Sequence, residues 1–104
     1  MNINVTQCDG QTVIAPEGML DSVSTARFQE VIKEVLASQQ TAASLDIVLD
    51  LSGLAYTSSM GVRAILSLMK AVMARQGKLV FRNVCPSVKE IFDLSGLSQA
   101  MVIE

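Results

Sequence analysis

The hydrophobic positions along the chain change their spacing several times, and each change marks a new predicted element. Near the N-terminus Ile3 and Val5 alternate with polar neighbours, and the mostly apolar residues 12–15 follow after the turn residues Asp9-Gly10. Two short strand-like segments around such a turn predict a β-hairpin. Residues 16–18, which read Pro-Glu-Gly, are expected to end its second strand.

Helical spacing follows in two long segments. Apolar residues recur every three to four positions over residues 23–39, and Asp21 or Ser22 stands where a side chain caps the first turn. A second amphipathic helix is predicted over residues 59–75, and Gly77 follows its end.

Strands are predicted between these helices and beyond them. Residues 46–51 have too little polar alternation for a strand with one wet face, so we expect a central strand covered by helices. Residues 78–81 form a further strand, and a third helix runs from Pro86 to a stop at Gly96. Residues 101–103 add a last short strand.

Strands that alternate with helices across short connections imply right-handed crossovers and parallel pairing. The N-terminal hairpin adds an antiparallel pair, so we expect an α/β fold with a small mixed, largely parallel sheet and flanking helices. The length of 104 residues fits a single domain over residues 1–104. Sites in such sheets gather beyond the carboxyl ends of the strands, here at residues 17–24 and 54–61.

The composition argues against several classes of function. The chain has no histidine, the usual general base near neutral pH, and neither of its two cysteines belongs to a CxxC motif. We therefore expect a protein that is not an enzyme, without metal or cofactor, in the reducing cytoplasm. A net charge of −2 and only four aromatic residues argue against nucleic-acid binding. The most apolar stretch, residues 60–74, contains Arg63 and Lys70 and is too short to cross a membrane.

Three hydroxyl residues in a row, Thr57, Ser58 and Ser59, link the central strand region to the second helix. One interpretation is helix capping by Ser58 or Ser59, which contributes about 1 kcal/mol and accounts for one hydroxyl. The other is covalent modification of a serine. A phosphate there meets free N–H groups and the positive end of the helix dipole, while its charge of about −1.5 to −2 opposes an acidic or apolar partner.

The second helix also carries an additional small and apolar stripe, formed by Met60, Ala64, Leu68 and Ala71. This stripe lies beside the core stripe and leaves only a narrow polar face. It either packs under a neighbouring helix of the same domain or forms an exposed docking patch for a partner.

Residues 50–66, which read DLSGLAYTSSMGVRAIL, resemble the STAS-domain family, the anti-sigma factor antagonists of bacteria. Gly18-Met19-Leu20-Asp21 is similar to the G-x-L-D of that family before its first helix, and Ser95-Gly96-Leu97 is similar to its C-terminal third. The resemblance covers essentially the whole chain and implies the STAS fold.

The resemblance also implies a mechanism. In that family a serine kinase that doubles as an anti-sigma factor phosphorylates the second residue of a D/S-S pair, which corresponds to Ser59 here, with Ser58 as the alternative. The unphosphorylated domain binds this kinase, phosphorylation releases it, and a metal-dependent serine phosphatase restores binding. Asp21 and Ser22 correspond to loop residues beside that surface.

These arguments predict one set of partner-binding residues: Asp21, Ser22, Thr57, Ser58, Ser59, Met60, Gly61, Arg63, Ala64 and Leu68. The competing hypothesis is an unphosphorylated subunit of a permanent transport or signalling assembly, in which the second helix is buried and never modified.

Overall fold

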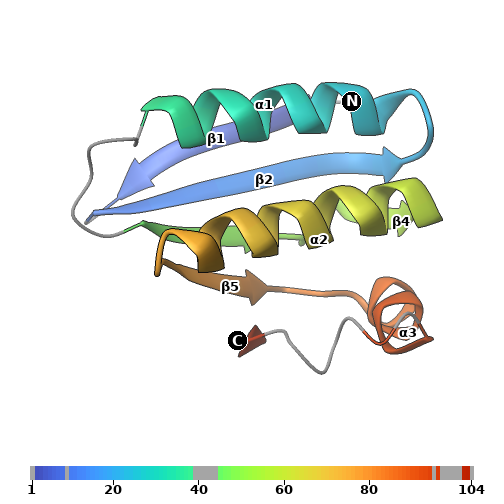
Figure 1. Ribbon diagram of the computed structural model, residues 1–104. Helices are drawn as coiled ribbons and strands as arrows, with labels where there is room; N and C mark the ends of the chain where they lie inside the picture. Colours follow the sequence, from blue (N-terminus) through green and yellow to red (C-terminus); the bar gives the residue numbers. More distant parts are fainter. Residues whose placement is uncertain (1, 9, 39–44, 95, 97–101, 104) are drawn as a thin grey trace.

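The computed structural model describes residues 2–8, 10–38, 45–94, 96 and 102–103. Its elements follow one another along the chain as shown in Figure 1: β1 (Asn2–Cys8), β2 (Gln11–Leu20), α1 (Ser24–Ser38), β3 (Asp46–Asp50), β4 (Leu54–Thr57), α2 (Ser59–Ala74), β5 (Lys78–Arg82), α3 (Pro86–Leu94) and β6 (Val102–Ile103). The predicted strands and helices are present among the described residues, and β4 is an addition; positions 39, 95 and 101 of the predicted elements lie outside the described residues.

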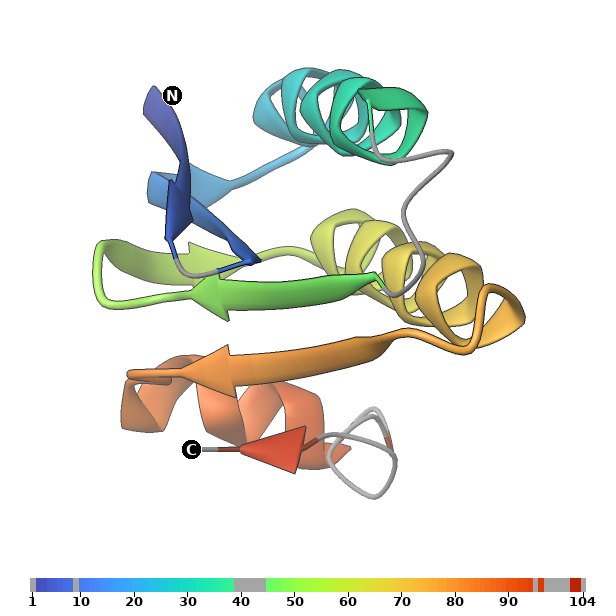
Figure 2. The ribbon, with the colours of Figure 1, turned by 90° about the vertical axis from the view of Figure 1, so that its left-hand side faces the viewer.

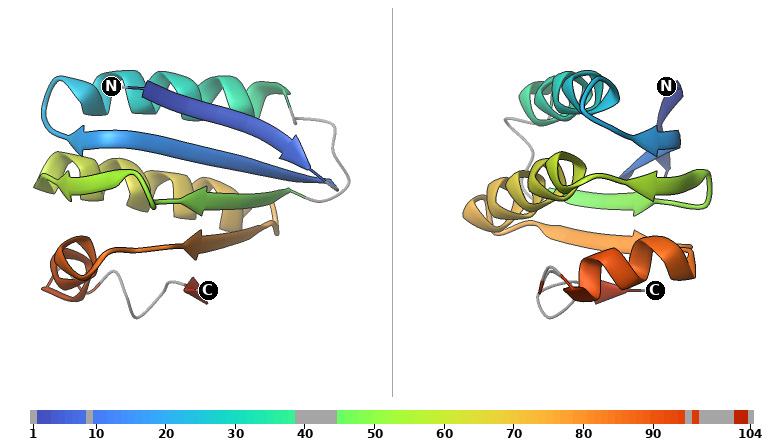
Figure 3. Two further views of the ribbon diagram at one scale, coloured as in Figure 1. Left: turned by 180° about the vertical axis from the view of Figure 1, so that it is seen from behind. Right: turned by 90° about the vertical axis from the view of Figure 1, so that its right-hand side faces the viewer.

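The strands form one mixed sheet in the order β1-β2-β3-β5-β6, and β4 pairs separately with β2. Only the β1–β2 pair is antiparallel among the pairs that the described residues make. Helices α1 and α2 lie side by side on one face of the sheet (Figure 2), and from behind the strands lie in front of both helices (Figure 3). The predicted α/β fold with a largely parallel sheet is therefore confirmed.

The central strand was predicted correctly. Ile47, Val48 and Leu49 of β3 are all buried, β2 and β5 flank this strand, and Ile47 and Leu49 belong to the main hydrophobic core. Helix α3 joins the core through Phe92, whose ring meets Phe81 of β5 edge to face at a centroid distance of 6.1 Å. Such fully buried side chains contribute about 1.5–3 kcal/mol each relative to exposure.

Strand β2 is longer than predicted. Residues 16–18 do not end it, and the strand continues to Leu20. The reason is a change of partner: residues Thr12 to Ile14 pair with β3, whereas Gly18 to Leu20 pair with β4. Pro16 lies between the two parallel registers, so its missing N–H interrupts neither ladder. Gly18 has φ +103° at the register shift, a conformation that suits glycine.

Strand β4 was missed. The sequence pattern predicts no strand over residues 54–57, yet they form a short strand beside the end of β2. Leu54 and Thr57 are buried whereas Ala55 and Tyr56 are exposed, so the segment lacks the two-residue period that predicts a strand.

Among the described residues, no helix is long and apolar enough to span a membrane.

Candidate functional site

Two of the loops expected to carry function lie next to each other at one end of the molecule. Strands β2 and β4 run parallel, with Leu20 opposite Thr57, so the connections that follow them emerge at the same edge. The backbone N–H of Ser58 donates to the carbonyl of Leu20 at 2.8 Å and ties the two connections together. The start of α2 is thereby fixed against the end of β2.

The three consecutive hydroxyl residues occupy three different environments. Ser58 is the N-cap of α2: its backbone is extended (φ −83°, ψ 172°), and its Oγ accepts a hydrogen bond from Gly61 N at 3.3 Å. Thr57 is buried, and its hydroxyl donates to the carbonyl of Ser58 at 3.1 Å. Ser59 is the first helical residue and is exposed. The capping interpretation therefore holds for Ser58 and leaves the Ser59 side chain facing solvent.

Gly61 is required by the close approach of three elements. A Cβ at this position would collide with Oγ1 of Thr57 and come within 2.8 Å of Cβ of Leu20. The first turn of α2 therefore sits directly on the ends of β2 and β4. This packing against β2 and β4 fixes the backbone of the turn that carries Ser59.

Asp21 caps α1 at the opposite side of the same surface. Its Oδ1 accepts hydrogen bonds from Ser24 N at 2.8 Å and from Val23 N at 3.1 Å, so Asp21 and not Ser22 is the capping residue. These hydrogen bonds, chiefly the one from the Ser24 backbone, hold the pKa of Asp21 below its ordinary value of 3.8. An ionised carboxylate thus stands beside the start of α2.

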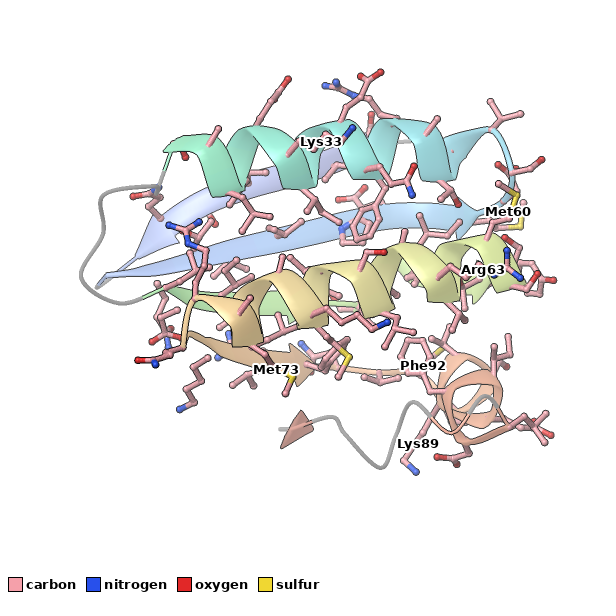
Figure 4. The ribbon with its side chains drawn as sticks, in the orientation of Figure 1. Lys33, Met60, Arg63, Met73, Lys89 and Phe92 are labelled. Atoms are coloured by element: carbon pink, nitrogen blue, oxygen red, sulfur yellow. The ribbon has the colours of Figure 1, made fainter. Side chains whose placement is uncertain are left out.

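Exposed apolar side chains surround this end of the molecule. Met19 is 53% exposed, Val23 81%, Tyr56 48% and Met60 48%, and we call these four residues the apolar rim. Met19 and Tyr56 are directly opposite each other in the β2–β4 pair, so they share one face of the sheet. Met60 and Arg63 lie together where α2 begins (Figure 4). The sequence pattern does not indicate Met19 and Tyr56, because they become neighbours only through the β2–β4 pair, and it assigns Val23 to the helix predicted over residues 23–39.

Four of the predicted partner-binding residues are not on the surface. Thr57, Gly61, Ala64 and Leu68 are buried, so their side chains are not exposed on the surface of the domain. Ala64, Leu68 and Ala71 lie along a groove between α1 and α2, so this part of the stripe faces a neighbouring helix of the same domain, whereas Met60 is exposed. Asp21, Ser22, Ser59, Met60 and Arg63 are exposed, and Ser58 is half-buried.

The described residues contain no group of His, Cys, Asp or Glu side chains arranged to hold a metal ion. Exposed charged side chains at this end of the molecule include Asp21 before α1 and Arg63 on α2. The arrangement is that of an exposed serine at the start of α2, with Asp21 in the neighbouring connection and Arg63 one turn further along the helix.

Comparison with known proteins adds a family. The family model described as STAS domain matches residues 2–104. BtrV of Bordetella bronchiseptica, provisionally named an anti-sigma factor antagonist, is 32% identical over 96 residues, covering 92% of this chain and 79% of BtrV.

Solved structures share the fold. An anti-sigma factor antagonist from Mycobacterium paratuberculosis matches with a TM-score of 0.83 at 20% identity, over 98% of this chain and 83% of that one. The anti-sigma factor antagonist SpoIIAA in its unphosphorylated form matches with a TM-score of 0.80 at 24% identity, over 99% and 88%. The phosphorylated form of SpoIIAA from Bacillus matches with a TM-score of 0.72 at 22% identity, over 99% and 91%.

Proposed function

The chain belongs to the STAS domain family, and we propose that it is a bacterial anti-sigma factor antagonist that exchanges partners through phosphorylation of Ser59. Without phosphate it binds a serine kinase that serves as the anti-sigma factor. Phosphorylation of Ser59 releases the kinase, and a metal-dependent serine phosphatase restores binding. The chain is then a regulatory substrate in the cytoplasm and supplies no catalysis of its own.

The observation that carries this proposal is the division of roles among the three hydroxyls. Ser58 accepts the capping hydrogen bond and Thr57 is buried, whereas Ser59 is exposed at the first helical position. A phosphate on Ser59 therefore replaces no hydrogen bond of the cap. The N–H groups of the first helical turn and the helix dipole favour an anion at this position. SpoIIAA, which shares the fold, has a phosphorylated and an unphosphorylated form.

The surface around Ser59 supports a partner that docks there. The exposed members of the predicted set and the apolar rim lie on the last residues of β2 and β4, on the connections that follow these strands and on the first turns of α2. A partner seated on the rim excludes water around Ser59. A phosphate with a charge of about −1.5 to −2 is costly to desolvate in such an interface, so phosphorylation weakens docking.

Two variants of Ser59 test the proposal. Pull-downs from the source bacterium with wild type and with Ser59→Asp identify the kinase as the protein lost only from the variant. With that kinase purified, Ser59→Ala is expected to bind like wild type and to take up no phosphate. Ser59→Asp is expected to bind at least about tenfold more weakly, since desolvation of the added carboxylate in the interface costs more than about 1.4 kcal/mol.

Ser58→Ala is the matched control. This variant loses the N-cap and about 1 kcal/mol of unfolding free energy, yet it is expected to remain a substrate of the kinase. Phosphorylation that persists in Ser59→Ala and disappears in Ser58→Ala would move the site to Ser58. If mass spectrometry of the protein from its native cell finds Ser59 unmodified under all conditions, the permanent transport or signalling assembly becomes the better hypothesis.

A further inference from the structure

We infer that Arg63 forms an ion pair with the phosphate when Ser59 is phosphorylated. The switch then includes an internal ion pair along the first turns of α2. This inference rests on the proposed function insofar as Ser59 carries a phosphate. It concerns what the modified residue contacts within the chain. It assigns Arg63 a role as a positioning residue for the phosphate.

The helical geometry brings the two side chains together. Ser59 and Arg63 are both exposed and stand four residues apart on α2, a spacing that puts Cβ atoms roughly 5–6 Å apart on one face. Side chains on a helix lean toward its N-terminus, so Arg63 lies over the turn that Ser59 begins. An acidic group that precedes a basic one by four residues is also the favoured order along a helix. Figure 4 shows the Arg63 side chain beside Met60 at this end of α2.

Arg63 is the cation of α2 that stands within reach. The next one along the helix, Lys70, lies eleven residues beyond Ser59, about 16 Å at 1.5 Å per residue. Elsewhere Arg27 pairs with Glu30 at 3.3 Å and Lys89 pairs with Asp93 at 3.4 Å. A planar guanidinium also suits a phosphate better than an ammonium does, because two of its N–H groups reach two oxygens at once.

The surrounding charges favour the Arg63 side for the phosphate. The Asp21 carboxylate is fixed by the N-terminal N–H groups of α1, and the hydrogen bond from Ser58 N to Leu20 O holds its loop against the start of α2. A phosphate dianion on Ser59 is repelled by Asp21 and attracted by Arg63. Phosphorylation therefore adds negative charge to the surface and also neutralises the positive charge that Arg63 presents to a partner.

The test measures the phosphate itself. Protein with phosphoserine incorporated at position 59 during synthesis is titrated with pH and followed by ³¹P NMR. A neighbouring cation stabilises the dianion, so wild type is expected to show a second phosphate pKa about 0.5 lower than Arg63→Gln, the size of an exposed ion pair. Lys70→Gln, an equally exposed change on the same helix, is expected to match wild type. Arg63→Lys is expected to fall between wild type and Arg63→Gln.

Equal phosphate pKa values in wild type and Arg63→Gln, with circular dichroism showing both folded, would overturn the inference. So would a shift of the same size in Lys70→Gln. The phosphate is installed without a kinase, so this titration does not depend on whether a kinase uses Ser59. Absence of kinase labelling at Ser59 rejects the proposed function, whereas absence of the Arg63 effect rejects only the ion pair.

Discussion

Gly61 is the residue at which the elements of the site approach one another most closely. The first turn of α2 packs there against Leu20 of β2 and Thr57 of β4 without room for a side chain. The hydroxyl of Thr57 is turned to the carbonyl of Ser58, so the same contact orients the capping residue. The absence of a side chain at Gly61 thus allows the close packing that fixes the position of Ser59.

Gly61→Ala is expected to destabilise the protein by about 1–3 kcal/mol, because the new Cβ overlaps Thr57 and Leu20 in a packed region. In an unconstrained helix the same change would stabilise by about 1 kcal/mol, so the sign of the effect is diagnostic. Urea unfolding measures it. Ser67→Ala, an exposed change on the same helix, is the control and is expected to stay within about 0.5 kcal/mol of wild type. A Gly61→Ala protein as stable as wild type would contradict the close approach.

At the scale of elements, the caps of α1 and α2 differ in charge. Helix α2 is capped by a neutral serine and α1 by an ionised aspartate. The cap of α2 therefore contributes no titrating group of its own, whereas the cap of α1 couples the stability of the domain to pH. The capping residue that adjoins Ser59 in the chain is therefore itself uncharged.

Asp21→Asn tests the coupling at α1, since it keeps an oxygen for the cap and removes the titrating charge. The folded pKa of Asp21 is lowered by its hydrogen bonds, so its contribution is complete above 3.8 and is lost as pH falls through the folded pKa. Wild type is expected to be the more stable protein at pH 7, and the gap is expected to close as the pH falls below about 3.8. Urea unfolding at a series of pH values measures it.

Asp50 titrates in both proteins and therefore cancels from the comparison. Its pKa is also lowered: desolvation by burial raises it, but hydrogen bonds from Ser52 and Asn83 outweigh that effect. A gap between wild type and Asp21→Asn that persists unchanged at low pH would show that the charge of Asp21 does not stabilise α1.

The elements also show what a sequence can and cannot reveal. Helices α1 and α2 and strand β3 were predictable, because their apolar residues follow the period of the structure they form. Strand β4 was not, because its central residues Ala55 and Tyr56 are both exposed. The end of β2 was misjudged because Pro16 and Gly18 usually stop a strand, and here they lie where the partner strand changes. Each error concerns a pairing between distant segments.

At the scale of the whole molecule, contacts between distant segments also limit how much of the candidate site can be predicted from the sequence. The capping role of Asp21 was predictable from the local pattern, whereas Ser59 as the modified residue stays a prediction from the family resemblance. The apolar rim was not, since Met19 and Tyr56 become neighbours only through the β2–β4 pair. The burial of Ala64 and Leu68 depends in turn on α1 lying against α2. The spacing of apolar residues predicts that a helix face is apolar. Which element packs against that face depends on the tertiary structure.

The arrangement also predicts that charge at Ser59 changes the surface and leaves the fold intact. Ser59→Asp is expected to keep the far-UV circular dichroism of wild type. Its amide resonances are expected to shift only around the β2–α1 and β4–α2 connections, because Ser59 is exposed and α2 remains anchored by buried residues such as Ile65. Comparison of ¹H–¹⁵N spectra measures this. Shifts that extend into β5 or α3 would mean that the charge rearranges the core.

A serine in the first turn of a helix is presented to an enzyme as part of a folded shape. Ser59 follows a cap that fixes its backbone, and the turn rests on the ends of two strands that are far apart in the sequence. An unfolded chain or a short peptide has the same amino-acid sequence but lacks this surface. Under the proposed function, the kinase acts on correctly folded molecules and passes over misfolded ones. Only molecules that are able to bind the kinase are then phosphorylated and take part in the exchange of partners.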